Sequence, residues 1–136
     1  MTTFDTKIKI ILRNGLEPWQ ELNVTAFLVS GIAGTQAIIG EPYIDADGVQ
    51  YLPMSQQPIM IHTANVDQLR DIMKKAIEKE MAVTIYTNEL FTTYNDEDNR
   101  TEIAKYTTDK LDLVGIGIRG KKNPLDRITK GIDMHR

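Results

Sequence analysis

Polar side chains that could do chemistry follow the first and third apolar segments of this 136-residue chain. They are Asn14, Gln20, Asn23, Asn88, Glu89, Thr92 and Thr93. Ligands of open α/β sheets bind beyond the carboxyl ends of the strands, so both groups are expected to line one crevice. A carboxylate in such a crevice acts as a general base on water where burial brings its pKa towards neutrality. Glu89 and Thr92 are therefore catalytic candidates, and the ligand-binding candidates are Gln20, Asn23, Asn88 and Thr93.

A structural interpretation of these residues stays open beside the catalytic one. Asn and Thr side chains commonly satisfy nearby backbone groups, and a glutamate that follows a strand is commonly a solvated cap. The two interpretations differ in geometry, because a functional crevice requires Asn23, Glu89 and Thr92 to converge on one pocket.

Two lysines near the end of the chain indicate a second kind of site. Lys121 and Lys122 precede Asn123-Pro124, a pair typical of a helix start, because Asn caps helices and Pro suits their first position. The free N–H groups of a helix start attract phosphate or sulfate. The turn at residues 120–125 is therefore predicted to bind a small anion weakly.

A glycine motif in the last apolar segment is misleading. Residues 115–120 (GIGIRG) match the G-x-G-x-x-G pattern of dinucleotide-binding sites. That pattern needs its glycines after a strand, at the opening of a helix. Here two of the glycines lie inside the apolar strand, so they are expected where a neighbouring element packs closely.

Composition and charge limit the classes of function. The length and the 41% of hydrophobic residues fit one domain over residues 1–136. The chain contains no cysteine, which excludes thiolate chemistry and fits a cytoplasmic location, and no segment approaches the roughly 18 apolar residues of a membrane helix. No cofactor and no metal site is expected. Residues 119–136 carry a net charge of +4 and the remainder −7, which disfavours a broad nucleic-acid footprint but leaves room for one or two phosphates.

The apolar pattern predicts alternating strands and helices, which is typical of an α/β layer sandwich. Strands are expected at residues 7–13, 58–63, 81–86 and 113–118, helices at 18–32, 65–80, about 99–108 and 125–130, and a surface hairpin at 41–52. The first helix is apolar around most of its circumference, more than one side of a small sheet needs. Trp19 and Phe27 could anchor a subunit interface, so a homodimer is expected.

Three segments together resemble one family: WQELNVTAFLVSGIAG (19–34), GEPYIDADG (40–48) and the ending from Leu111. On these segments the chain is identified as a member of the bacterial domain-of-unknown-function family number two thousand, over essentially its whole length. The resemblance implies a fold similar to that of peptidyl-tRNA hydrolase II. That fold is a three-layer α/β/α arrangement, in which a four-stranded mixed sheet has helices on both faces.

The working residues of that hydrolase match this chain poorly. The ending LDRITKGI (125–132) looks like the enzyme's closing motif. However, the enzyme's K-[IL]-A-A-Q pattern meets Glu21 in place of lysine and Thr25 in place of glutamine, and of its D-A-G-x-T motif only Thr92 agrees. A glutamate there removes the cation that would hold a phosphate or an oxyanion. The missing lysine and the acidic body of the chain favour a module of this fold that binds a small anionic ligand or a partner chain, without peptidyl-tRNA hydrolase activity. The alternative is an ester or amide hydrolase that uses Glu89 and Thr92.

Overall fold

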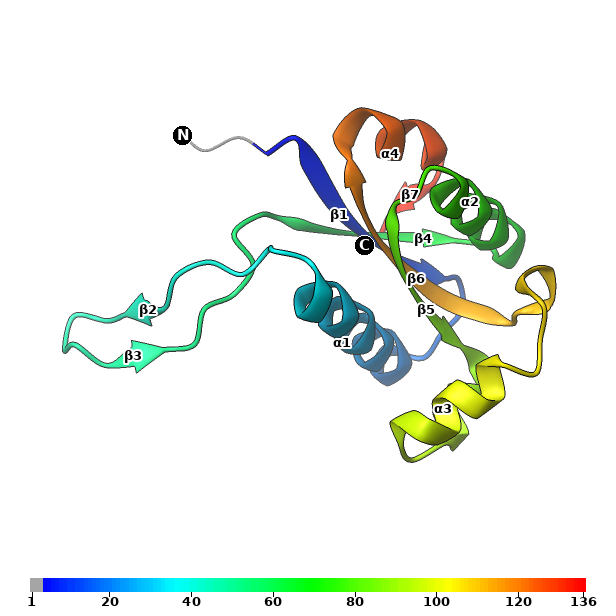
Figure 1. Ribbon diagram of the computed structural model, residues 1–136, viewed down its shortest axis with the longest axis horizontal. Helices are drawn as coiled ribbons and strands as arrows, with labels where there is room; N and C mark the ends of the chain where they lie inside the picture. Colours follow the sequence, from blue (N-terminus) through cyan, green and yellow to red (C-terminus); the bar gives the residue numbers. More distant parts are fainter. Residues whose placement is uncertain (1–3) are drawn as a thin grey trace.

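The computed structural model describes residues 4–136, and its helices and strands follow the alternation that the sequence predicts (Figure 1). The elements in order are β1 (Thr6–Arg13), α1 (Pro18–Thr35), β2 (Tyr43–Ile44), β3 (Gln50–Tyr51), β4 (Ile59–Ala64), α2 (Val66–Glu78), β5 (Ala82–Thr87), the 3₁₀ turn η1 (Asn88–Thr92), α3 (Asp96–Ile103), the 3₁₀ turn η2 (Thr108–Lys110), β6 (Leu113–Lys121), α4 (Lys122–Ile128) and β7 (Asp133–Met134). The expected hairpin is confirmed as β2 and β3, which form a separate two-stranded sheet.

The main sheet is mixed and has five strands in the order β5-β6-β1-β4-β7. β1 and β4 are parallel, and the other neighbouring pairs are antiparallel. The expectation of four strands is therefore wrong. The fifth strand, β7, pairs only Asp133 and Met134 with the edge of β4, and two residues of mixed polarity give no strand pattern in the sequence.

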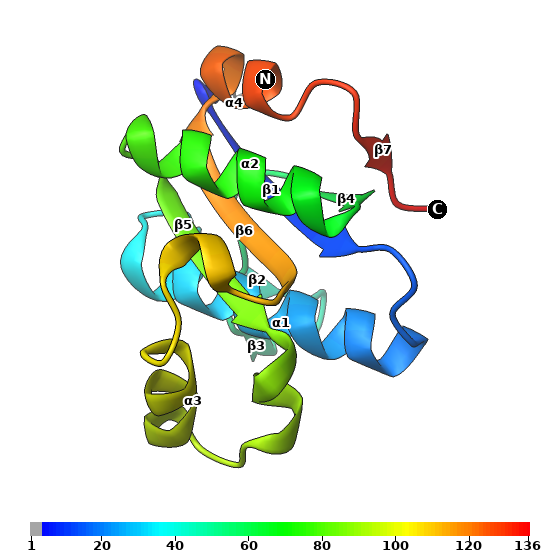
Figure 2. The same cartoon turned by 90° about the vertical axis from the view of Figure 1, so that its right-hand side faces the viewer.

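Helices cover both faces of this sheet, α1 on one side and α2 with α4 on the other (Figure 2). The alternation of strand side chains divides β1 between the two cores. Ile8 and Ile10 pack towards α1, whereas Ile11 packs towards α2. The α/β/α layering is confirmed, and the specific likeness to peptidyl-tRNA hydrolase II stays a prediction.

Two helices begin at other residues than the sequence suggests. α3 begins at Asp96 and not at residue 99, because the side chain of Asn95 caps it by accepting a hydrogen bond from Asp98 N (2.8 Å). α4 begins at Lys122 and not at Leu125, because β6 continues to Lys121 and the Lys122 backbone N–H donates to Asp5 O (2.9 Å). Pro124 is still tolerated in the first turn, where a backbone N–H needs no helical acceptor.

Two glycines of the misleading motif, Gly115 and Gly117, stand where side chains of α1 and β5 pack closely on β6. A Cβ atom built on Gly115 would lie 2.7 Å from Val24 Cγ1, and one on Gly117 would lie 2.5 Å from Thr84 Oγ1. The packing interpretation is therefore confirmed for these two glycines.

We expect Gly117→Ala to lower the free energy of unfolding by about 1.5 kcal/mol, because the added methyl group overfills a packed interface. Gly34→Ala is the matched control: a Cβ there meets no atom within 4 Å, and alanine in a helix stabilises by about 0.5–1 kcal/mol. Urea unfolding of both variants measures the difference. A Gly117→Ala variant as stable as Gly34→Ala would refute the packing explanation.

Candidate functional site

A pocket of about 390 Å³ opens beside α1, between the end of β5, η1 and the start of α3. Its lining residues are Trp19, Asn23, Phe27, Tyr86, Leu90, Phe91, Thr93, Tyr94, Asn95, Asp96 and Asn99. Ligand pockets are typically about 300–1,000 Å³ in volume and mostly apolar, with a few polar groups that fix orientation. This pocket has both properties.

Aromatic rings form the walls of the pocket. Trp19 meets Phe91 edge-on with ring centroids 5.7 Å apart, and Tyr86 lies 5.1 Å from Phe91 and 5.9 Å from Phe27. Trp19, Asn23 and Phe27 are four residues apart, so they share one face of α1. Trp19 and Phe27 remain 59% and 53% exposed. The excess apolar surface of α1 thus lies in part at this pocket.

Several polar groups of the pocket have no partner within the described residues. The Asn23 side chain forms no hydrogen bond there, and neither does the hydroxyl of Tyr86. The Oδ1 atom of Asn99 contacts the Thr93 hydroxyl, which leaves the Asn99 Nδ2 atom as a donor. Burial raises the pKa of Tyr86, so its phenol stays protonated and can donate. These groups can satisfy both donors and acceptors of a ligand.

Of the seven residues that were expected to line one crevice, Asn23 and Thr93 line this pocket, Asn14 lines a different one, and four others do not line it. Gln20 belongs to the capping box of α1, where its Oε1 atom accepts a hydrogen bond from Glu17 N (2.9 Å). Asn88 is exposed. The Thr92 hydroxyl donates to the backbone oxygen of Glu89 (3.0 Å). The Glu89 Oε2 atom is buried and has no hydrogen-bond partner within residues 4–136.

The turn that is expected to bind an anion is already in contact with a carboxylate, that of Asp5 in the segment before β1. Lys121 Nζ forms an ion pair with Asp5 Oδ2 at 2.7 Å, and the hydrogen bond from Lys122 N to Asp5 O adds a second contact. The side chain of Lys122 is exposed. Asp5 therefore competes with any anion for Lys121.

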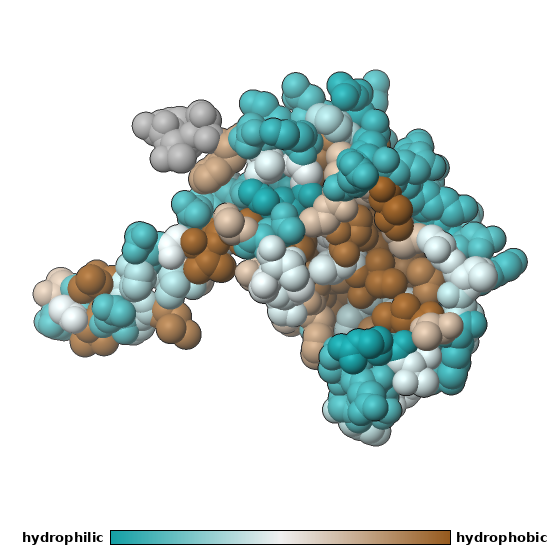
Figure 3. All heavy atoms as spheres, viewed as in Figure 1, coloured by the Kyte–Doolittle hydropathy of each residue, from teal (hydrophilic) through white to brown (hydrophobic). Residues whose placement is uncertain are grey.

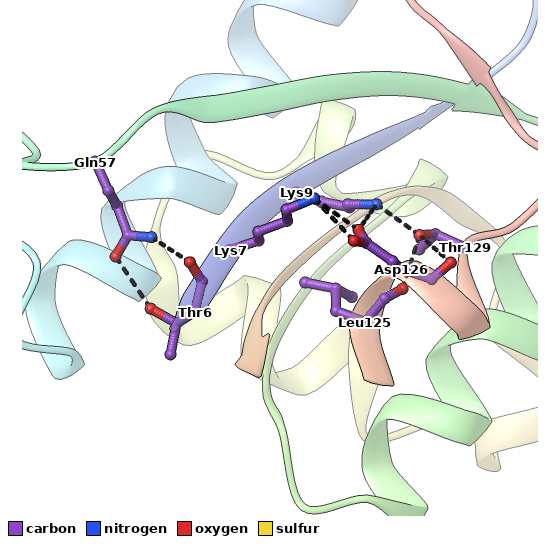
Figure 4. A network of polar contacts seen from close by, with 7 residues as sticks. All are labelled: Thr6, Lys7, Lys9, Gln57, Leu125, Asp126 and Thr129. Atoms are coloured by element: carbon purple, nitrogen blue, oxygen red, sulfur yellow. Dashed lines mark hydrogen bonds and ion pairs between the residues drawn. The ribbon is translucent and has the colours of Figure 1, made fainter. Parts of the chain in front are cut away.

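A buried polar cluster beneath α4 explains the family-like ending LDRITKGI (Figure 4). Lys9, whose side chain is 7% exposed, donates to Thr129 Oγ1 (2.7 Å) and pairs with Asp126 Oδ1 (3.0 Å). Lys7 donates to both carboxylate oxygens of Asp126, at 3.0 and 2.8 Å. The Thr129 hydroxyl donates to Leu125 O (2.7 Å). The contacts of Lys7 and Lys9 join α4 and its C-cap residue to β1, so this cluster fastens the last helix to the sheet.

The environments of His62 and Glu21 also indicate structural roles for these two residues. Burial and the nearby charge of Lys9 lower the pKa of His62, although the Asp133 backbone opposes the shift, so its ring is neutral. Glu21, which stands where the resemblance places a lysine, lies 2.6 Å through Oε2 from His135 Nε2. That contact ties α1 to the segment after β7.

A model of the family described as protein of unknown function (DUF2000) matches residues 6–136. The chain belongs to this family. A solved structure of a protein of unknown function from Agrobacterium tumefaciens is 42% identical, with a TM-score of 0.93, and the alignment covers 98% of this chain and 100% of that one. No curated protein matches this chain. Within residues 4–136, none of its helices combines the length and apolar character needed to cross a membrane.

Sequence reasoning missed most of the aromatic residues that form the pocket. In the sequence, Tyr86 ends the expected strand at residues 81–86, Phe91 lies in the segment that directly follows it, and Asn99 begins an expected helix. The spacing of Trp19, Asn23 and Phe27 was the available signal, because residues four apart on a helix share a face.

Proposed function

We propose that the protein is a binding module for a small, planar, uncharged molecule, such as a heterocycle or an aryl amide, held in the aromatic pocket. The observation that carries the proposal is the lining itself. Five aromatic residues surround unpartnered amide and phenol groups, and within the described part of the chain no Lys, Arg or His is among the lining residues. Aromatic walls favour flat rings, which they contact by stacking or edge-on.

The polar groups narrow the chemistry of the ligand. Asn23 offers one donor group and one acceptor, and the Nδ2 atom of Asn99 adds another donor. This set complements the edge of a heterocycle or an amide. A phosphate or carboxylate would enter without a cation, and among residues 4–136 the only charged lining residue is Asp96, which pairs with Arg100. The lining therefore favours neutral ligands over the anions expected from Lys121 and Lys122.

A binding role is favoured over hydrolysis because the catalytic candidates lie outside the lining. The buried, unpartnered Oε2 atom of Glu89 is the one observation in favour of a hydrolase, because a carboxylate oxygen without a hydrogen bond is able to accept a proton. The Thr92 hydroxyl, however, is engaged with the backbone, and neither side chain lines the aromatic pocket. We further propose that the protein does not cleave peptidyl-tRNA.

The single tryptophan makes the proposal testable, because Trp19 lies in the pocket. We expect neutral heterocycles or aryl amides to change the Trp19 fluorescence with a saturable dose response, and phosphorylated derivatives of the same rings to bind at least tenfold more weakly. Calorimetry on the strongest compounds provides a second readout. Tighter binding of the phosphorylated derivatives, or no saturable binding of any neutral ring, would refute the proposed ligand class.

A further inference from the structure

Residues 40–55, hereafter the arm, extend away from the body of the protein (Figure 1). Hydrogen bonds from Gly40 N to Met54 O (3.0 Å) and from Gln56 N to Ile38 O (2.8 Å) close its base. Asp45 orders its tip by accepting hydrogen bonds from Val49 N (3.0 Å) and the Tyr51 hydroxyl (2.8 Å). The arm is thus a defined hairpin, although an isolated two-stranded hairpin is only marginally stable in water.

The arm exposes apolar side chains along its length (Figure 3). They are Tyr43, Ile44, Val49, Tyr51, Leu52 and Met54, with Leu52 86% and Ile44 66% exposed. Together they offer on the order of 600 Å² per copy. Two copies reach the roughly 1,200 Å² at which specific protein interfaces begin. Several large apolar side chains exposed on one short hairpin indicate an interaction site.

Charge restricts what the arm can bind. It carries Glu41, Asp45 and Asp47 and no basic residue, and the chain contains no Lys or Arg between Arg13 and Arg70. An arm with a net charge of −3 is repelled by nucleic acid and by anionic lipid. Its complement is a protein surface that combines apolar and basic side chains.

This chain has such a surface beside the base of its own arm. A pocket of about 470 Å³ there is lined by Met81, Ala82 and Pro124 together with Lys79, Arg119 and Lys121. Within residues 4–136, Glu80 is its only acidic lining residue. Because Lys121 is paired with Asp5, Lys79 and Arg119 supply the positive charge that remains. Gln36, at the end of α1 where the chain leads into the arm, lines the pocket and accepts a hydrogen bond from Arg119 Nη1 (3.0 Å).

We propose that the arm docks on a second copy of this chain, tip to base, with its acidic tip in the partner's basic pocket. Two arms side by side about a two-fold axis run in opposite directions. The tip of each arm then lies at the base of the other, which is where the pocket is found. The contact is made twice and closes, as an isologous dimer requires. This interface leaves the aromatic pocket beside α1 free, so it is independent of the proposed ligand.

Sedimentation velocity tests whether the arm forms the dimer interface. Protein concentrations of roughly 5–100 µM cover the range in which a dimer of moderate affinity dissociates. We expect a dimer for the parent chain and a monomer for the double variant Ile44→Asp with Leu52→Asp, with at least a hundredfold rise in the dissociation constant. Ile77→Asp, an exposed apolar position on α2, is the matched control and should remain dimeric. Circular dichroism checks that each variant is folded.

A charge exchange tests the tip-to-base arrangement. Asp47→Lys and Lys79→Glu should each weaken the dimer about tenfold, and together they should restore it. A monomeric parent chain, or a dimer that survives Ile44→Asp with Leu52→Asp, would overturn the proposal. Failure of the exchange to restore the dimer would overturn the assignment of the basic pocket. Ligand-induced changes in Trp19 fluorescence should persist in all of these variants, which separates this test from that of the proposed function.

Discussion

Asp126→Asn is expected to lower the free energy of unfolding by about 2 kcal/mol, whereas Lys9→Met should change it by less than about 1 kcal/mol. The asparagine leaves the buried Lys9 ammonium without its anion, and an uncompensated buried charge is strongly destabilising. The expected loss is below the full cost of a buried pair because the Asp126 side chain is 42% exposed and partly screened.

Lys9→Met is the matched variant because it removes the buried charge itself. Asp126 keeps its two hydrogen bonds from Lys7, and the Thr129 hydroxyl keeps its bond to Leu125 O. Methionine also fills much of the volume that the lysine chain occupied. Urea unfolding at pH 7 measures both variants. Equal losses for the two would contradict the account of α4 as fastened through a buried charge.

The ion pair between Lys9 and Asp126 also predicts that the free energy of unfolding depends on pH. Hydrogen bonds from Lys7 and Lys9 lower the pKa of Asp126, while burial opposes them, so the folded protein holds this carboxylate ionised to lower pH than the unfolded chain does. The stabilisation is present above pH of about 4 and is lost as the pH falls through the lowered pKa. The gap between the parent chain and Asp126→Asn should therefore narrow between pH 5 and the acid limit of the fold, on the order of pH 3. A gap that stays constant over that range would argue against the ion pair as its source.

The second large effect is expected on the affinity for the ligand that the fluorescence screen identifies. Trp19→Ala should weaken its binding about 10–100-fold, because loss of one ring from an aromatic stack costs about 1–3 kcal/mol. Asn23→Leu keeps a similar volume without the amide and should weaken binding about tenfold, since a ligand group loses its partner. Both side chains are exposed, so the fold should be retained.

Leu22→Ala is the control for these pocket variants. Leu22 is a large exposed apolar residue on the same helix, but it faces away from the aromatic pocket and does not line it. Isothermal titration calorimetry compares all three variants, because Trp19→Ala removes the fluorescent reporter. Equal affinity losses for Leu22→Ala and Trp19→Ala would show that the pocket does not hold the ligand.

Helices and strands with a clear apolar periodicity are predictable from the sequence of this chain. Where tertiary contacts decide the ends of an element, the sequence alone does not predict them. The cap of α2 illustrates the first case, because Asn65 and Gln68 form the expected capping box. The start of α4 illustrates the second. Asn123-Pro124 is a sound local signal for a helix start, but the pairing of β6 with β1 extends through Lys121 and moves the start of α4 to Lys122.

The candidate site was predictable only in part for the same reason. Asn23 and Thr93 were found because they follow strands of the sheet, and both line the pocket. Within η1 and the residue after it, however, the turn geometry directs Leu90, Phe91 and Thr93 to the pocket, while Glu89 and Thr92 lie outside its lining. Consecutive residues of a 3₁₀ turn point in different directions, and sequence order alone does not reveal which of them meet.

The most direct test of the ligand-binding account is a two-dimensional ¹H–¹⁵N NMR titration with the strongest neutral compound from the screen. The account predicts shifts of the single indole N–H signal of Trp19 and of the side-chain amides of Asn23 and Asn99, with one common dissociation constant. The amides of residues 119–122 should stay unchanged. Shifts confined to residues 119–122, with the Trp19 signal unmoved, would contradict the account.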